Sequence, residues 1–273
     1  MRIATNVNWH AVWAVVRKDL TAVRRSKPIV IPMALVPLLL LVVMPTLIGL
    51  FARTAGEVDL TEALEELPSN VSEPITSLPP DEQVIMLVLG FLMAGLFVIV
   101  PLMVSAVLAA DAFAGEKERR TLESLLHLPI RDRDLFLAKV LTAMIPALTI
   151  SWVGFFCYAV ISNVIAWPVM ERIFIPTKLW LVMIFWVGPA VALVGLGIMV
   201  RVSARARTTQ EATQLGGTVI LPVIFMSLGW TSGILTLDLR TAFAIGAVIW
   251  VLAGWLVFGG ARRFTRGLLV ERT

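Results

Sequence analysis

The sequence predicts an all-α, polytopic membrane protein whose 273 residues form one transmembrane domain. Three observations support this class: an apolar composition, long uncharged runs, and an uneven distribution of lysine and arginine. The chain is 58% hydrophobic and 15% charged, and its mean hydropathy is +0.88. Typical soluble domains are about 25% charged. A soluble fold of this size needs a more polar surface, so the composition excludes that class.

Helices that cross a bilayer are indicated by nearly uncharged apolar runs of about 18 residues or more. Six runs meet this rule: 29–51, 84–110, 136–166, 179–200, 213–234 and 241–261. The second exceeds the roughly 20 residues that a bilayer requires, so we expect it to tilt or to project into the cytoplasm. Lys139 lies near the start of the third run, where we expect it to snorkel. The first run is too long for the core of a signal peptide, so we expect it to be retained.

The distribution of basic residues predicts the orientation. Nineteen of the 23 Lys and Arg residues lie in the N-terminal segment, in 111–139, in 201–212 and in the C-terminal tail, and four lie in the alternate loops. An excess of positive charge marks the cytoplasmic side, so both termini are expected there. The pI near 9.7 then follows from topology and gives no support to a nucleic-acid partner.

Residues 8–27 are predicted to form an amphipathic helix at the membrane surface. Apolar residues recur at spacings of 3, 1, 3, 4 and 3 along one helical face; they are Trp9, Val12, Trp13, Val16, Leu20 and Val23. Charged residues fill much of the rest, namely Arg17, Lys18, Asp19, Arg24 and Arg25. Pro28 is expected to break the helix. Such a helix lies in the interface, and the sequence leaves open whether it is a gate element or an anchor.

The loop at 52–83 is expected outside the cell, and it carries eight acidic residues against Arg53. Within it, EVDLTEALEEL is a candidate short helix, whereas SEPITSLPP, with three prolines, is expected to be extended or turning. The acidic residues are able to collect cations, and a solvated tether is the plainer role. At roughly 30 residues the loop is too small for a catalytic domain.

Patterns for catalysis and metal binding are missing from the sequence. No stretch matches GxxxxGK[ST], so no loop for a nucleotide phosphate is expected. His10 and His127 lie far apart and no HExxH occurs, which argues against zinc. No span contains a histidine to activate Ser232, and the single Cys157 excludes a disulfide framework. We therefore expect no enzyme activity, cofactor or metal in this chain.

The segment AGEKERRTLESLLHLPIRDRDLFLAKVL, residues 114–141, is the most informative part of the chain. Residues 116–128 are predicted to form a cytoplasmic helix of about three turns that ends before Pro129. Leu122, Leu125 and Leu126 form a short apolar face among charges of both signs. This arrangement suits docking into a groove of another protein, but the leucines are equally able to rest on the neighbouring spans.

This segment closely resembles the cytoplasmic loop between the second and third spans of ABC type-2 exporter permeases. The matching residues are Glu116, Lys117, Glu118, Arg119, Thr121, Leu122, Glu123, Leu125, Leu126, Pro129, Ile130 and Lys139. A second stretch, SARARTTQEATQLGGTVILP at residues 203–222, is similar to the loop between the fourth and fifth spans of that family. With the six-span layout, the resemblance covers nearly the whole chain, and the nearest branch looks like the sodium- and multidrug-efflux permeases.

The resemblance implies that residues 116–128 are a coupling helix, which sits in a cleft of a separate ATP-binding cassette ATPase subunit that holds ATP and Mg. Two permease chains, either two copies or this chain and a paralogue, would enclose the path in the plasma membrane of a prokaryote. The residues implied to contact the ATPase are Glu116, Glu118, Arg119, Arg120, Thr121, Leu122, Glu123 and Leu126, joined by Arg205, Arg207 and Glu211 of the second loop.

The resemblance also implies a translocation path along the second and fifth spans. The candidate lining residues are Phe91, Phe97, Met103, Phe225 and Met226, although helix packing is the plainer role for each of them. The fifth span is rich in glycine and contains Pro222, so we expect it to break or re-enter near its outer end.

Taken with the resemblance, the sequence predicts a permease subunit of an ATP-driven exporter that moves an ion, drug, peptide or lipid. Two alternatives stay open. A membrane assembly or sensor factor that does not transport would use the same coupling helix. A membrane-embedded enzyme would need a catalytic constellation that the sequence does not display.

Overall fold

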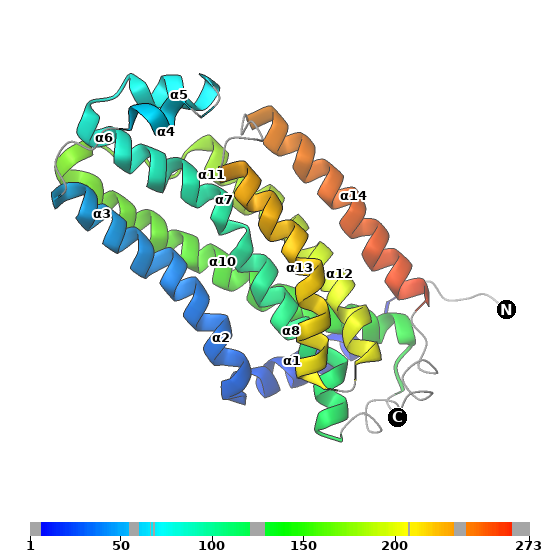
Figure 1. The fold of residues 1–273 in the computed structure, drawn as a ribbon. Helices are drawn as coiled ribbons and strands as arrows, with labels where there is room; N and C mark the ends of the chain where they lie inside the picture. The colour runs from blue at the N-terminus through cyan, green and yellow to red at the C-terminus, as the bar shows by residue number, and fades with distance from the viewer. Residues whose placement is uncertain are drawn as a thin grey trace.

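The computed structural model describes residues 7–54, 60–65, 67, 69–120, 129–206, 208–231 and 239–263. All regular structure within these ranges is helical (Figure 1). The long helices lie side by side as one bundle, and α1 (Trp9–Arg25) runs across one end of it. The all-α class predicted from the sequence is confirmed.

Five helical rods are long and apolar enough to cross a membrane, counted over the described residues. They are Lys27–Ala52, Pro80–Glu118, Asp132–Met170, Lys178–Ser203 and Leu239–Gly259. They correspond to the first, second, third, fourth and sixth predicted spans. A multi-pass membrane protein is therefore confirmed.

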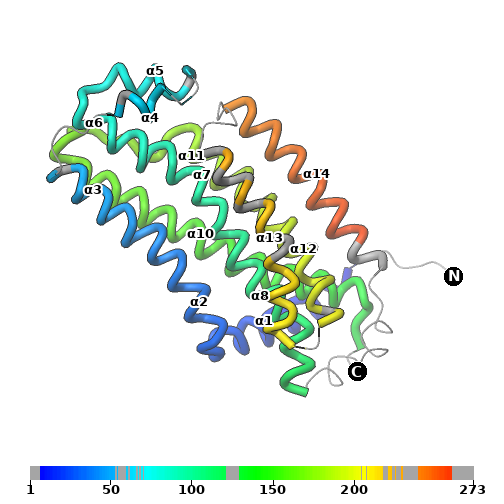
Figure 2. The backbone as a smooth tube through the Cα atoms, viewed as in Figure 1, coloured from blue at the N-terminus to red at the C-terminus, as the bar shows by residue number. Residues whose placement is uncertain are grey.

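Several of these rods are built from more than one element, and Figure 2 shows the tube passing through each without turning back. The first rod contains α2 (Lys27–Leu38), η1 (Leu39–Val43) and α3 (Met44–Thr54). The second contains α6 (Pro80–Ile85), η2 (Met86–Leu92), α7 (Met93–Phe97) and α8 (Ile99–Glu118). The third is α10 (Asp132–Met170) alone. The fourth contains α11 (Lys178–Val182), η3 (Met183–Val187) and most of α12 (Gly188–Arg205). The last is the greater part of α14 (Leu239–Arg263).

The predicted fifth span corresponds to α13 (Thr209–Thr231), which is not among the five rods. Its first turn is polar, with Thr209, Gln210 and Glu211. The sixth crossing therefore stays a prediction. The helix continues unbroken through Pro222 to Thr231, so the expected break does not occur in this stretch, and Gly233 lies outside the described residues.

The π-helical segments η1, η2 and η3 interrupt three of the rods. A π-helical turn displaces backbone carbonyl oxygens from their usual donors, and apolar surroundings offer no water to replace them. In η2, the Tyr158 hydroxyl donates to the Leu89 carbonyl at 2.6 Å and the Trp180 indole donates to the Gly90 carbonyl at 2.9 Å. In η3, the Trp250 indole donates to the Trp186 carbonyl at 3.1 Å. Aromatic donors, buried in the case of Tyr158 and Trp180 and half-buried in the case of Trp250, thus stabilise the irregular backbone of η2 and η3.

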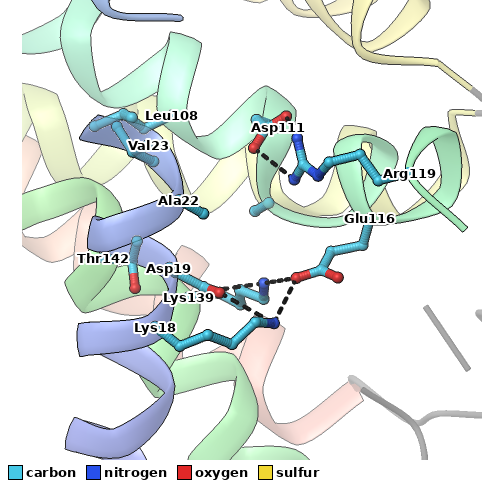
Figure 3. A pocket seen from close by; sticks show the side chains of 11 residues that line it. Lys18, Asp19, Ala22, Val23, Leu108, Asp111, Glu116, Arg119, Lys139 and Thr142 are labelled. Atoms are coloured by element: carbon cyan, nitrogen blue, oxygen red, sulfur yellow. Dashed lines mark hydrogen bonds and ion pairs between the residues drawn. The ribbon is translucent and has the colours of Figure 1, made fainter. Parts of the chain in front are cut away.

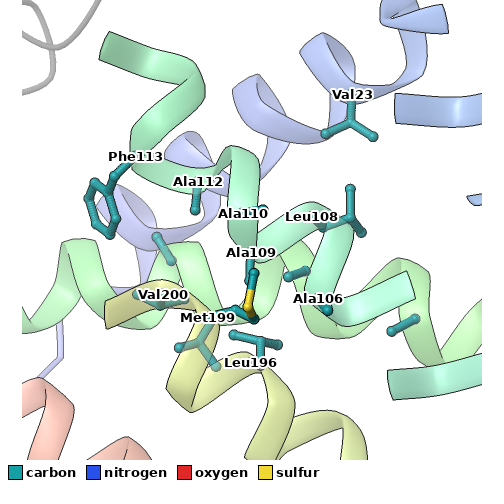
Figure 4. Packing of buried hydrophobic residues seen from close by; sticks show 14 of the residues in the cluster. Val23, Ala106, Leu108, Ala109, Ala110, Ala112, Phe113, Leu196, Met199 and Val200 are labelled. Atoms are coloured by element: carbon teal, nitrogen blue, oxygen red, sulfur yellow. The ribbon is translucent and has the colours of Figure 1, made fainter. Parts of the chain in front are cut away.

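Small residues bring α8 and α12 into close contact. Figure 4 shows Ala109 of α8 beside Met199 and Leu196 of α12, and these residues belong to one buried apolar cluster. A Cβ added at Gly195 would overlap the Leu102 side chain. The Ser203 hydroxyl donates to the Ala110 carbonyl at 2.6 Å and accepts from the Phe113 and Ala114 amides at 3.1 and 3.0 Å. This packing holds the end of α8 firmly against α12.

Helix α1 occupies the predicted segment 8–27, and the Asn8 side chain caps it by accepting from the Ala11 amide at 3.2 Å. The predicted apolar face is divided into two parts. Val12, Val16 and Val23 are buried in the core, whereas Trp9 and Trp13 are 54% and 45% exposed. The valines therefore pack on the bundle and not on the membrane, because α10 and α2 lie directly against that side of α1.

The predicted outer loop contains two short helices, α4 (Thr61–Glu65) and α5 (Ser69–Thr76). The first lies in the predicted helical stretch. The prediction for SEPITSLPP was wrong in its first half, because α5 includes Pro74. A single proline removes one backbone donor, which a short helix tolerates. Ser77 and Leu78 form a turn and Pro79 is extended, as the sequence predicted, whereas Pro80 is already the first residue of α6.

Candidate functional site

A buried ion network lies at the end of the bundle that α1 crosses (Figure 3). The Lys139 ammonium of α10 lies 2.8 Å from the Asp19 carboxylate of α1 and 3.2 Å from the Glu116 carboxylate of α8. The side chain of Lys139 is only 3% exposed. The predicted snorkelling of Lys139 was therefore wrong, because two carboxylates satisfy its charge inside the protein.

Lys18 completes the network from the solvent side. Its ammonium lies 3.1 Å from Glu116 and 3.4 Å from Asp19. Two ammonium groups and two carboxylates balance each other, and the Lys139 ammonium also lies 5.7 Å from the centre of the Phe113 ring. Each buried charge needs this balance, because an unpaired ion in a protein interior costs several kcal/mol.

The electrostatics of Lys18 follow from this geometry. Partial burial lowers the pKa of its ammonium, but the carboxylates of Asp19 and Glu116 outweigh burial, so the pKa lies above its usual value of 10.5. Lys18 is therefore charged at neutral pH. The two paired lysines and two paired acids act as one neutral unit that joins three helices.

A second ion pair lies beside the network. The Arg119 guanidinium donates to both carboxylate oxygens of Asp111 at 3.0 Å, and this bidentate contact raises the pKa of Arg119. Gly115 makes room for the pair, since a Cβ there would overlap the Asp111 carboxylate. Both groups line a cavity of about 240 Å³ with Lys18, Asp19, Glu116 and Lys139, closed on other sides by Ala22, Val23, Leu108, Ala112 and Thr142.

Helix α8 ends at Glu118, and Arg119 and Arg120 form a turn in which Arg120 has a φ of 55°. The predicted helix at 116–128 therefore does not begin at Glu116. Residues 116–118 are the last turn of α8, because the network and Ser203 hold the α8 backbone up to this point. The predicted contacts Thr121, Leu122, Glu123 and Leu126 lie outside the described residues.

The structure brings the end of α8 together with the loop between α12 and α13. The Glu118 carboxylate accepts from the Thr209 hydroxyl, and the Lys117 ammonium donates to the Ala206 carbonyl at 3.2 Å. Arg205 and Glu211, the other predicted contacts in this loop, are exposed, as is Arg120. Arg207 lies outside the described residues. Glu116 is instead buried and engaged by lysines of this chain.

The predicted lining residues do not share one surface. Phe97 is fully buried, with ring centres 6.0 Å from Phe155 and 5.7 Å from Trp180. Phe91 is buried in a different apolar cluster, Met103 is half-buried, and Phe225 is 67% exposed. The side chain of Met226 is outside the described part of the structure. Packing explains Phe91 and Phe97 in a single subunit.

Sequence reasoning missed the role of Asp19, although a signal was present. Asp19 is the single acidic residue among residues 1–27. It follows Val12 and Val16 at spacings of seven and three residues and precedes Val23 by four, so it lies on the apolar face of the helix. An acidic residue on a face that will be buried requires a basic partner, and Lys139 was the basic residue within a predicted span.

A family model described as ABC-2 family transporter protein matches residues 13–259. The match begins within α1 and ends within α14, so it includes the ion network and the loop between α12 and α13. No curated protein matches the chain.

Proposed function

Because this chain belongs to the ABC-2 family of transporter proteins, we propose that it is the membrane-spanning permease subunit of an ATP-binding cassette exporter. It moves an ion, drug, peptide or lipid out of the cytoplasm with ATP that a separate ATPase subunit binds with Mg and hydrolyses. The absence of GxxxxGK[ST] from the sequence fits this division. A second permease chain, a copy or a paralogue, completes the path.

The ion network is the observation that carries this proposal. It joins α1, α8 and α10 at the point where α8 leads into residues 119–128. Separation of these helices would leave buried charges without partners. A movement of the segment that follows α8 is therefore passed on to the spans as a rigid-body shift, as the transmission of ATPase motion requires.

The neighbourhood of α8 and the second loop supports the same role. The contacts of Glu118 with Thr209 and of Lys117 with Ala206 hold the two segments at one end of the bundle. Arg120, Arg205 and Glu211 are exposed and lie close in sequence to Glu118, Ala206 and Thr209, respectively. An ATPase subunit docked there contacts both segments at once, so its closure acts on α8 and on the α12–α13 connection together.

Phe225 is the lining candidate to test first. It is 67% exposed in the single subunit, so it is available to a path enclosed by two permease chains. Transport that is unchanged in Phe225→Ala would remove it from the path.

Co-purification from native membranes tests the proposal. The Glu123→Arg/Leu126→Asp variant alters the segment implied to dock, and Glu73→Arg/Thr76→Asp is a matched control with the same spacing on exposed positions of α5. We expect an ATPase subunit to accompany the wild type and the control, and to be lost or uncoupled in the test variant. If no ATPase accompanies the wild type, the exporter assignment fails. If one does but no candidate solute stimulates it, the assembly or sensor alternative replaces transport.

A further inference from the structure

The outward flank of α1 carries a stripe that the ion network does not use. Trp13, Arg17 and Arg24 follow one another at spacings of four and seven residues, so they lie above one another on the same flank of the helix. All three side chains are exposed. Trp9 precedes Trp13 by four residues and extends the stripe by a further turn.

On the exposed side of α1 the residue types change from aromatic to basic, which is the order expected from the membrane interface towards water. The valines Val12, Val16 and Val23 face the core, the two tryptophans come next, and Arg17 and Arg24 follow beyond them. Tryptophan prefers the level of the lipid headgroups, where one edge of the ring is apolar and the other is hydrated. A basic side chain next to it lies at the level of the phosphates.

The arginines of this stripe form no ion pair with the described residues of the protein. Among the described residues, the ion pairs of α1 are those of Lys18 and Asp19, and none involves Arg17, Arg24 or Arg25. Lys18 turns toward Glu116, on the other flank of the helix (Figure 3). The basic residues of α1 are thus divided into one that serves the network and others that face outward.

The stripe lies where the chain enters the membrane. Helix α1 ends at Arg25, and α2, the start of the first membrane-spanning rod, begins two residues later at Lys27. Arg25 and Lys27 are exposed at this junction. The orientation predicted from the distribution of Lys and Arg places it in the cytoplasmic leaflet, which carries the anionic lipids.

We propose that Trp13, Arg17 and Arg24 of α1 form a binding surface for anionic phospholipid headgroups of the cytoplasmic leaflet. The arginines pair with headgroup phosphates, and Trp9 and Trp13 hold the helix at that depth. Each basic residue near an anionic surface strengthens the association about fivefold at physiological salt. Lys18 and Asp19 of the same helix pair with Glu116 of α8 and Lys139 of α10. Lipid bound to the stripe is therefore connected through α1 to these two helices.

Lipid retention by the purified full chain tests the proposal. The protein is incorporated into vesicles of equal phosphatidylglycerol and phosphatidylcholine, extracted in mild detergent, and the retained lipids are counted by mass spectrometry. Arg17→Gln/Arg24→Gln is compared with Lys178→Gln/Arg240→Gln, which removes two exposed charges from other positions. We expect the wild type and the control to be enriched in phosphatidylglycerol, and the α1 variant to lose the enrichment at least several-fold. High salt should also reduce the phosphatidylglycerol enrichment of the wild type, because it screens the arginine charges.

Two results would overturn the proposal. One is equal enrichment in the wild type and the α1 variant. The other is an equal loss in the α1 variant and the control, which would show a general effect of net charge. The ATPase co-purification assay separates a protein contact from a lipid contact. If the α1 variant keeps its enrichment but loses the ATPase subunit, the stripe binds that subunit and not lipid.

Discussion

Lys139 and Asp19 are 120 residues apart in the sequence, and their side chains meet at 2.8 Å in the interior of the bundle. Glu116 joins them at 3.2 Å from the same ammonium. The contact links the helix that precedes the first span to the start of the third predicted span. It also links both to the last turn of α8, next to the segment that resembles a coupling helix.

Replacement of Lys139 should show that the network is cooperative. Lys139→Met leaves the carboxylates of Asp19 and Glu116 with Lys18 as their partner in the network, so we expect a loss of about 3–5 kcal/mol in unfolding free energy. Lys139→Met/Asp19→Asn keeps the pair of Lys18 and Glu116 balanced. Its loss of unfolding free energy should be smaller than the sum of the losses in the two single variants. A double-mutant cycle by thermal unfolding in detergent measures the coupling, for which we expect about 1–3 kcal/mol. Additive losses would contradict cooperation within the network.

Gly115→Ala should disturb the pair of Asp111 and Arg119. The added methyl group overlaps the Asp111 carboxylate, so the carboxylate must turn away from the guanidinium. Gly254→Ala is the matched control, because its methyl group meets nothing within 4 Å and gains the helix preference of alanine. We expect Gly115→Ala to be less stable than the control by about 1–3 kcal/mol in thermal unfolding. Equal stability would show that Asp111 adapts without loss.

Removal of the aromatic donors should weaken the π-helical segment η2. Tyr158→Phe removes the hydroxyl that donates to the Leu89 carbonyl, and Trp180→Phe removes the indole N–H that donates to the Gly90 carbonyl. We expect each variant to lose about 1–2 kcal/mol of unfolding free energy. Trp152→Phe, at a 41% exposed aromatic position, serves as the control and should change little. A similar loss in all three variants would refute a specific role for the two hydrogen bonds.

Alkaline pH should abolish the contribution of Lys18. Its folded-state pKa is raised above the usual 10.5, so the stabilisation is fully present below pH 10.5 and is lost as the pH rises through the folded-state pKa. The difference in Tm between the wild type and Lys18→Met should therefore be constant at neutral pH and should shrink only once the pH exceeds 10.5. The effect is small, because half of the side chain is exposed. A difference that persists unchanged in strong alkali would mean that Lys18 acts through packing and not through charge.

Much of the fold was readable from local patterns. The apolar runs predicted the five rods, since hydrophobic length is a property of the sequence alone. The ends agree to within about four residues, except that the second rod continues past 110 to Glu118. The α1 segment was also predicted from periodicity, and the candidate helix EVDLTEALEEL contains the short α4. The inclusion of Pro74 in helix α5 was not predicted. Whether a helix tolerates one missing backbone donor depends on the residues that surround it in the folded protein.

The candidate site was only partly predictable. The matching residues around Glu116 drew attention to the segment in which the ion network lies, but not to the partners of that carboxylate. Glu116, Lys139 and Asp19 come from three segments, and no local pattern specifies that they meet. Likewise, the burial of Phe97 among Phe155 and Trp180 depends on the approach of three helices.

The sequence by itself determined the membrane class, the positions of the long helices and the resemblance in residues 114–141, because each depends on composition or on spacing along one segment. The tertiary structure decided that Lys139 is buried between two acids, that α1 packs its valines on the bundle and exposes its tryptophans, and that α8 ends at Glu118 beside Thr209. These features require charges and surfaces from distant segments to meet. The buried charge of Lys139 is stable because its partners lie on two other helices. The packing of the helices is what brings these side chains together.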